Sequence, residues 1–236
     1  MRIGISGDLS KLGIKLGVAV AMNVVNDVPI DLSQEWNNAT QEAMKNTIST
    51  LLSDPIIRAY RDFYWRYLKI DPTKQRPSQE ALIRRLLNGG RVPTINPAVD
   101  IGNIVSIKYK VPIGLYDIDK IRAEKLVLRY AAEGEVFIPI GSPRRKLSNN
   151  QIVLAASDGT ILHVYPYRDS ELTMVDQTTK NILIISAGVP GISEETLLSA
   201  ATETGVLYEK YLRGRLIKVD LINGDKEIDV LPRRII

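Results

Sequence analysis

The stretch from Pro93 to Ile121 constrains the fold of this chain more than any other. It reads PTINPAVDIGNIVSIKYKVPIGLYDIDKI, with Asn96, Asp100 and Asn103 standing among apolar residues. A buried amide or carboxylate that lacks a hydrogen-bond partner costs about 1–3 kcal/mol. The segment is therefore either a hydrogen-bonded clasp, the interpretation we favour for Asp100, or the lining of a polar pocket.

Composition limits the class of protein. The 236 residues suffice for one large domain or two small ones, and a hydrophobic fraction of 44% can build a sizeable core. The absence of cysteine excludes disulfides, thiolate catalysis and thiolate zinc sites. The start MRIGISGDLSKLG lacks a signal-peptide pattern, and the most apolar run, Leu16 to Val25, is too short to span a bilayer. We expect a cytoplasmic protein without a membrane segment.

Positive charge is concentrated between Arg58 and Arg91. This segment holds nine Lys or Arg against three acids, although the whole chain carries a net charge of only +4. A basic patch on an otherwise balanced protein indicates a polyanionic partner, and the plainer alternative is a solvated helix face. Charge alone does not separate these two interpretations.

Helix signals dominate the chain after an extended segment over 1–30, in which 12–25 is expected to form a bent strand. Asp54 before Pro55 is a strong start signal, because a capping side chain precedes proline at the first helical position. The expected helices cover 31–52, 55–69, 79–87 with Ser78 as its cap and Gly89-Gly90 as its end, and about 194–212 after Ser193.

Strand signals dominate from residue 104 onward, in runs of Val, Ile and Tyr bounded by turn residues. Asp158-Gly159 predicts a tight turn, and Asn223-Gly224 predicts a C-terminal hairpin over 215–231. Together with the helices, these runs predict a single α+β domain over 1–236, an antiparallel or mixed sheet flanked by helices. The expected strands are 104–109, 126–130, 136–140, 152–155, 161–165 and 181–185.

On a helical wheel, residues 54–69 (DPIIRAYRDFYWRYLK) separate into an apolar and a basic face. Trp65 falls on the basic face. There it can stack on an RNA base, or pack under a loop beneath arginine stems, which is the commoner arrangement. The candidate RNA-binding residues are Arg61, Trp65, Arg76, Arg84 and Arg85.

Several segments together resemble one known module, the tRNA-editing (B-three/B-four) domain of the phenylalanyl-tRNA synthetase β subunit, and more closely its free-standing relatives. The resemblance covers about 55–190, with 1–54 and 191–236 as flanking elements expected to pack on this core. It rests on FYWRYLKIDPTKQRPSQEALIRR (63–85), INPAVDIGN (95–103), PIGLYDIDKI (112–121), AAEGEVFIPIG (131–141) and RDSELTMVDQTTKN (168–181).

The resemblance implies an activity and partners. In the synthetase this module hydrolyses tyrosine wrongly attached to phenylalanine tRNA. A relative is therefore expected to bind tRNA, with a synthetase as a second expected partner, and to deacylate mischarged aminoacyl-tRNA without cofactor or metal. The oligomeric state does not follow from it.

The family's pocket residues are carried over one at a time. Asn103 matches the asparagine of the editing pocket, whereas Gly102 and Gly114 stand where the family has threonine and histidine. Tyr116 lies in the same Pro-x-Gly-x-Tyr-Asp turn, and Glu171 falls near the acidic residue that reads the tyrosine hydroxyl. We name Asn103 and Gly114 as catalytic candidates, and Gly102, Tyr116 and Glu171 as substrate-binding candidates.

No serine-hydrolase elbow, zinc helix or phosphate loop occurs in the chain, and the single His163 stands in a strand, where a structural role is the commoner one. Hydrolysis of an activated ester needs only a held water and donors at the forming oxyanion. Backbone amides near Gly102 and Gly114 are candidates for those donors. Asp169 is a candidate to hold the substrate α-amino group, and Arg168 to hold phosphate.

Three functions are consistent with these residues. The leading one is a trans-editing hydrolase that acts on mischarged tRNA with a positioned water. The second is a catalytically silent module that binds tRNA or a synthetase, favoured by Gly114 in place of histidine. The third is an enzyme that acts on a small amino-acid derivative.

Overall fold

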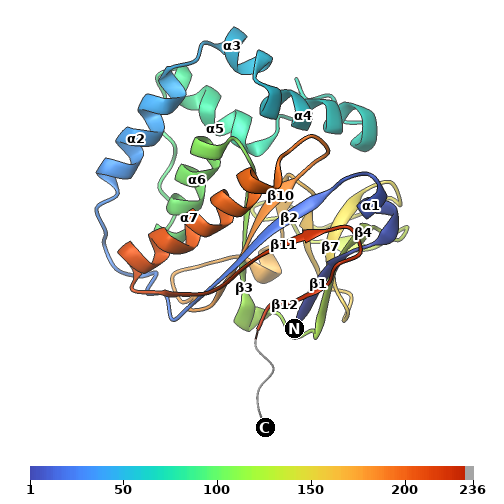
Figure 1. Cartoon of the computed structure of the whole chain (residues 1–236). Helices are drawn as coiled ribbons and strands as arrows, with labels where there is room; N and C mark the ends of the chain where they lie inside the picture. The colour runs from blue at the N-terminus through green and yellow to red at the C-terminus, as the bar shows by residue number, and fades with distance from the viewer. Residues whose placement is uncertain (232–236) are drawn as a thin grey trace.

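Two β-sheets form the centre of the computed structural model, which describes residues 1–231; residues 232–236, the end of the predicted C-terminal flank, lie outside that range (Figure 1). The four-stranded sheet is entirely antiparallel, and in the six-stranded sheet only the β1–β4 pair is parallel. The four-stranded order is β11 (Arg215–Asn223), β2 (Lys15–Met22), β10 (Ile182–Gly188) and β3 (Ile113–Asp117). The six-stranded order is β12 (Ile228–Asp229), β1 (Arg2–Ile5), β4 (Lys125–Tyr130), β7 (Ile152–Ala156), β8 (Ile161–Val164) and β9 (Arg168–Asp169).

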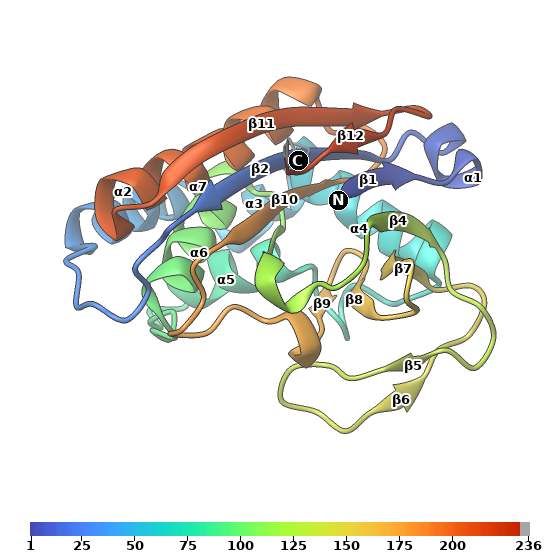
Figure 2. The same cartoon turned by 90° about the horizontal axis from the view of Figure 1, so that it is seen from below.

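The two sheets face each other, and apolar residues of both belong to one continuous core (Figure 2). A second, smaller core lies on the other face of the six-stranded sheet, where a two-stranded ribbon of β5 (Val136–Phe137) and β6 (Arg145–Lys146) provides Phe137. Layering of this kind buries both faces of the six-stranded sheet. It agrees with the burial of every residue of β7 and β8.

Helices cover the outer face of the four-stranded sheet (Figure 1). The long helix α7 (Glu194–Leu212) contacts β2, β10 and β11, and it begins as expected, with Ser193 Oγ accepting the Thr196 amide. Small residues let it approach closely: a Cβ at Gly17 would collide with the Leu197 carbonyl carbon at 2.7 Å. The other helices are α1 (Gly7–Lys11), α2 (Ser33–Met44), α3 (Ile48–Ser53), α4 (Pro55–Phe63), α5 (Ser78–Leu87) and α6 (Pro97–Tyr109).

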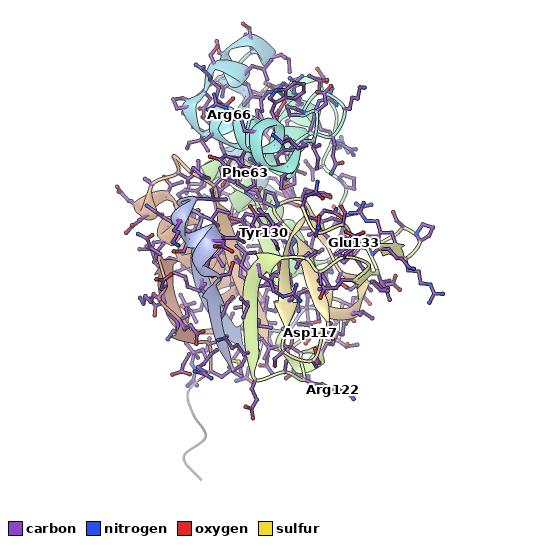
Figure 3. The ribbon with its side chains drawn as sticks, turned by 90° about the vertical axis from the view of Figure 1, so that its right-hand side faces the viewer. Phe63, Arg66, Asp117, Arg122, Tyr130 and Glu133 are labelled. Carbon is purple, nitrogen blue, oxygen red and sulfur yellow. The ribbon has the colours of Figure 1, made fainter. Side chains whose placement is uncertain are left out.

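The helix predicted at Asp54-Pro55 is present. Asp54 Oδ1 accepts the amides of Ile56 and Ile57, and the helical path continues from α4 through a π-helical turn, Tyr64–Leu68, to Lys69. The Tyr60 hydroxyl donates to the Ala187 carbonyl at 2.6 Å, which ties this helix to the end of β10. In Figure 3, Phe63 lies where the helix meets the strands and Arg66 lies further out, matching their burial.

The strand predicted over 104–109 is wrong, because these residues form the second half of α6. Asn96 caps that helix by accepting the Val99 amide at 3.0 Å, and Pro97 occupies its first position. Apolar residues are buried around the whole helix, so the sequence shows no amphipathic period there. A short apolar run of this type does not distinguish a buried strand from a buried helix.

Two smaller expectations also need correction. The helix predicted over 31–52 is interrupted, because Thr47 and Thr50 form a capping box that begins α3 separately from α2. Ser78 is the first residue of α5 rather than a hydrogen-bonding cap. The expected turn at Asp158-Gly159 is present between β7 and β8, with Asp158 Oδ1 accepting the Thr160 amide at 2.9 Å.

The C-terminal hairpin over 215–231 is wrong in its pairing. β11 pairs with β2 in the four-stranded sheet, whereas β12 pairs with β1 in the six-stranded sheet. Gly224 does take a turn conformation, with φ of +68°. The chain uses that turn to pass from one sheet to the other.

Candidate functional site

A cavity of about 150 Å³ lies between the two sheets at the β3 edge. Its floor is apolar and comes from both sheets: Leu16, Leu128, Leu154 and Ile185. Side chains of α5 and α6 and the loop after β8 close the other sides. A cavity of similar size in another protein holds a benzene ring. The polar side chains around it are Ser78, Asn103, Ser106, Tyr116, His163 and Asp169.

Strand register brings these residues together. In the six-stranded sheet, Leu128, Leu154, His163 and Asp169 are direct cross-strand neighbours on β4, β7, β8 and β9. Cross-strand neighbours point to the same face of a sheet. In the opposite sheet, Gly114 pairs directly with Ile185. The cavity is therefore the space between two facing rows of side chains, and it contains residues far apart in the sequence.

Gly114 lies in this cavity, as the pocket interpretation expects, but Tyr116 takes the space above it. A Cβ added at Gly114 would lie 2.9 Å from the ring carbon of Tyr116 that bears the hydroxyl. No side chain fits at position 114 unless Tyr116 moves. Burial, followed by the nearby Asp169 carboxylate, raises the pKa of Tyr116 well above its usual value. The Tyr116 hydroxyl is accordingly neutral near neutral pH and can donate a hydrogen bond.

The sequence favours a structural role for His163, but the structure places its side chain at the wall of the cavity. Its Nδ1 lies 2.7 Å from Asp169 Oδ1, and its side chain is 7% exposed. The ring meets Tyr116 and Tyr165 edge to face, with centroid distances of 6.2 and 5.9 Å. The only signal in the sequence was a histidine and an aspartate on either side of a short turn. Without the register of β8 and β9, the sequence does not tell whether His163 and Asp169 are cross-strand neighbours or lie on opposite faces of the sheet.

Asn103 reaches the cavity from the middle of α6. Its amide makes no hydrogen bond to another group within residues 1–231, in contrast to neighbouring Ser106, whose hydroxyl donates to the Val111 carbonyl at 2.8 Å. Asn103 thus presents an uncommitted donor and acceptor to whatever occupies the cavity.

The other two polar residues of this segment form the clasp that we favoured for Asp100. Asp100 accepts the Ile95 amide at 2.9 Å. Asn96 accepts from the Asn26 side chain at 3.1 Å, and Asn26 in turn accepts the Ala98 amide at 2.8 Å. These bonds hold the start of α6 against the loop after β2, so that the helix carries Asn103 to a defined place.

Gly102 and Glu171 do not line the cavity. Gly102 lets α6 approach β3, since a Cβ there would lie 2.9 Å from a Leu115 methyl group. Glu171 follows β9 in a short 3-10 turn and is exposed. Both are assigned from an alignment of the linear sequence. How close Gly102 comes to the cavity depends on helix packing, and the direction of the Glu171 side chain depends on where β9 ends.

A second hollow of about 400 Å³ adjoins the cavity and shares Ser78 and Tyr167 with it. Three arginines line it, Arg76, Arg145 and Arg168, and no acidic residue of the described chain does. Arg168 donates to Ser142 Oγ at 3.0 Å, and Arg145 donates to the Tyr167 hydroxyl at 3.2 Å. The hollow therefore presents positive charge next to the cavity, and we call it the arginine hollow.

The remaining candidate RNA-binding residues divide into two groups. Arg61 and Arg84 both bond to the fully buried Glu80, at 3.0 and 2.7 Å. The Arg61 bond ties α4 to α5, and the Arg84 bond lies within α5, so both guanidinium groups are committed inside the fold. Arg85 is exposed, and Trp65 is 62% exposed, which rules out the packed alternative for Trp65.

Within residues 1–231 no group of three or more His, Cys, Asp or Glu side chains is arranged to hold a metal ion. No helix in the same range is both long and apolar enough to cross a membrane.

The fold and the site define an α+β protein with an aromatic, polar-edged cavity between two sheets and a basic hollow beside it. The sequence profile of the B3/4 domain family matches residues 59–218, and the chain belongs to that family. This confirms the family expected from the sequence motifs and extends the matched region past the expected end at 190.

Curated relatives are β subunits of phenylalanine–tRNA ligase. The chain is 29% identical to that of Dehalococcoides mccartyi over 181 residues, 70% of this chain and 22% of the relative. It is 27% identical to that of Bacillus subtilis over 217 residues, 90% of this chain and 25% of the relative. The chain thus spans about a quarter of the length of these relatives.

A solved structure shows the same fold. It is an N-terminal fragment of the phenylalanyl-tRNA synthetase β subunit from Pyrococcus horikoshii, with a TM-score of 0.52 and 16% sequence identity. The match covers 98% of this chain and 54% of the fragment. The predicted α+β class is therefore confirmed, including the mixed sheet and its helical cover.

Proposed function

We propose that this protein binds the aminoacylated 3′ end of a tRNA and hydrolyses the ester between amino acid and ribose. One observation carries the proposal: a cavity large enough for an aromatic side chain shares two wall residues with a hollow lined by three arginines. The two halves of an aminoacyl-tRNA end, an apolar side chain and a phosphate backbone, need such a pair of neighbouring sites. The kinship with tRNA ligase β subunits supports the same substrate class.

The apolar floor of the cavity suits the amino-acid side chain, whereas Asp169, the candidate for the α-ammonium group, bonds through Oδ1 to His163. Ser78 and Tyr167, at the junction of the two sites, would adjoin the ribose. Arg76, Arg145 and Arg168 would then contact the phosphates beyond it, because arginine donates paired hydrogen bonds to phosphate oxygens. Of these, Arg145 was not among the residues singled out in the sequence.

Ester hydrolysis needs donors where negative charge develops on the carbonyl oxygen. The Asn103 amide is uncommitted at the cavity wall, whereas the Tyr116 hydroxyl already interacts with the Asp169 carboxylate. Asn103 is therefore the donor that we assign to the developing oxyanion. A single donor of this kind contributes a factor of about 10²–10³ to the rate in other hydrolases.

The test is a panel of tRNAs mischarged with different radiolabelled amino acids, in which acid-precipitable radioactivity is followed with time. We expect turnover of at least one member above the spontaneous rate, and a loss of about 10²-fold in kcat for Asn103→Ala with binding retained. A folded protein that turns over no member of the panel would rule out the hydrolase.

The arginine hollow has its own test. Replacing Arg145 or Arg168 by Ala should weaken tRNA binding and reduce the slope of log K against log[salt] by about 1 for each phosphate that is no longer neutralised. Arg215→Ala is the matched control, because Arg215 is exposed on β11, at the opposite edge of the four-stranded sheet from β3. Equal salt slopes for all three variants would reject the hollow as the RNA-binding surface.

The second candidate, a catalytically silent tRNA- or synthetase-binding module, is favoured by Tyr116, whose ring excludes any side chain at position 114. A silent module would bind uncharged tRNA in a gel shift and leave every mischarged tRNA intact. The two candidates therefore give the same binding result and opposite hydrolysis results.

A further inference from the structure

His163 is the only histidine in the chain, and it lies at the cavity wall rather than in the solid core. It stands on β8, directly across from Asp169 on β9. The ring is held edge to face between Tyr116 and Tyr165, which limits its rotation. A buried, orientationally fixed imidazole beside a candidate ester site is a geometry that permits proton transfer.

The hydrogen bond with Asp169 determines the tautomer of the ring. An ionised carboxylate can only accept, so His163 Nδ1, 2.7 Å from Asp169 Oδ1, must carry the proton that it donates. The neutral ring then has no proton on Nε2. No group within residues 1–231 hydrogen-bonds to that nitrogen, which leaves it available as a base.

The other titratable groups that face the ring cannot take this role. They are Asp169 from β9, Tyr116 from β3, and Tyr165 and Tyr167 from the loop after β8, and no Lys, Arg or Glu of the described residues lines the cavity. Burial raises the pKa of both Tyr116 and Tyr165 well above the usual value, so they stay protonated. Asp169 is engaged with the histidine itself.

We propose that His163 is the general base of this cavity and that Asp169 is its positioning residue; the inference rests on the proposed ester hydrolysis. Nε2 takes a proton from a water molecule as the water oxygen bonds to the ester carbonyl carbon. The tetrahedral intermediate breaks its bond to the ribose oxygen, and the imidazolium returns the proton to that oxygen. The products are the free amino acid, whose carboxyl group releases a proton, and tRNA with an intact terminal hydroxyl.

The test compares three variants with the wild type on a tRNA that the wild type deacylates. His163→Asn keeps an N–H near the position of Nδ1 for Asp169 but has no basic nitrogen. Asp169→Asn replaces one carboxylate oxygen by an amide NH₂ group, so the side chain can also donate to Nδ1 and no longer fixes the proton there. His163→Ala leaves space for added imidazole. Circular dichroism and tRNA affinity serve as controls for folding and binding.

We expect His163→Asn to lower kcat by about 10²–10⁴-fold with little change in tRNA affinity, and to abolish the acid limb of the pH–rate profile. Asp169→Asn should also lower kcat. Imidazole should restore part of the activity of His163→Ala, at a rate that follows the unprotonated fraction of added imidazole. A merely structural histidine would show no such rescue and no change in profile.

The histidine also has a readout that does not involve turnover. As the chain has one histidine, its ¹⁵N ring signals are unambiguous, and they should show the proton on Nδ1 in the neutral ring. A proton on Nε2 would overturn the inference. Wild-type hydrolysis that persists in His163→Asn would overturn it while leaving the proposed function standing, whereas no wild-type hydrolysis of any mischarged tRNA would overturn both.

Discussion

Tyr116 leans back along β3 over Gly114, so that its ring fills the space where a side chain at position 114 would project. The two residues are separated by one residue on the same strand and therefore face the same side of the sheet. The absence of a side chain at Gly114 therefore does not let an ester approach the backbone, because the Tyr116 ring occupies that space. This arrangement also brings the Tyr116 hydroxyl to the cavity wall.

Gly114→Ala should lower the free energy of unfolding by about 1–3 kcal/mol, because an overpacked core must displace a buried tyrosine. Denaturant unfolding measures the difference. The control is Gly7→Ala, where an added Cβ would meet only Asp225 Oδ1 at 3.9 Å. An unchanged stability for Gly114→Ala would contradict the position of the Tyr116 ring.

The ion pairs of Glu80 with Arg61 and Arg84 should contribute to folding rather than to RNA binding. Glu80→Ala leaves two partly buried guanidinium groups without their carboxylate, and we expect a loss of about 3–5 kcal/mol in unfolding free energy. The matched control is Glu42→Ala, which breaks an exposed pair with Lys45 and should change stability by less than about 1 kcal/mol. Equal losses of unfolding free energy in Glu80→Ala and Glu42→Ala would show that the ion pairs of Glu80 are not buried.

We expect Asp176 and Asp100 to make the free energy of unfolding depend on pH in opposite directions. Hydrogen bonds from Lys120 and Thr178 lower the pKa of Asp176 to about 2, so its stabilising effect is present above the ordinary value of 3.8 and is lost as pH falls toward 2. The Asp176 side chain is 37% exposed and solvent screens the pair, so the effect should stay below about 1 kcal/mol. Comparing unfolding of wild type and Asp176→Asn between pH 2 and 5 measures it.

Asp100 behaves in the opposite sense. Burial raises its pKa above 3.8, and the Ile95 amide offsets only part of that rise. The folded state then binds more protons than the unfolded state just above 3.8, so stability falls as pH rises through this window. In Asp100→Asn this downward slope should disappear. A slope of the same sign for both aspartates would contradict the burial of the clasp.

Trp65 is the exposed aromatic residue of the basic helix, and we propose that it stacks on a base of bound RNA. Trp65→Ala should change unfolding free energy by no more than about 0.5 kcal/mol, since the side chain is 62% exposed. Its removal should weaken tRNA binding by about 1–3 kcal/mol. In a Trp36→Phe background, Trp65 is the only tryptophan, so quenching of its fluorescence by tRNA gives a direct reading. Full affinity without quenching would reject the contact.

Local chemistry determined much of the fold. Asp54 with Pro55, Ser193 and Asp158-Gly159 each satisfy or release backbone groups within a few residues, and each marks the element predicted from it. The incorrect predictions occur where neighbouring residues do not indicate the type of element or its pairing partner. The interior of α6 is apolar all round, and the turn at Asn223-Gly224 does not specify which strands it joins.

The sequence by itself determined the family, the main helix starts, and the presence of Asn103, Gly114 and Tyr116 in one segment, because motifs and caps are properties of neighbours in the chain. Only the tertiary structure decided that His163 meets Asp169, that Arg61 of α4 binds Glu80 of α5, and that the arginine hollow adjoins the cavity. Strand register and the stacking of two sheets made those choices, since both depend on burying apolar surface across the whole domain.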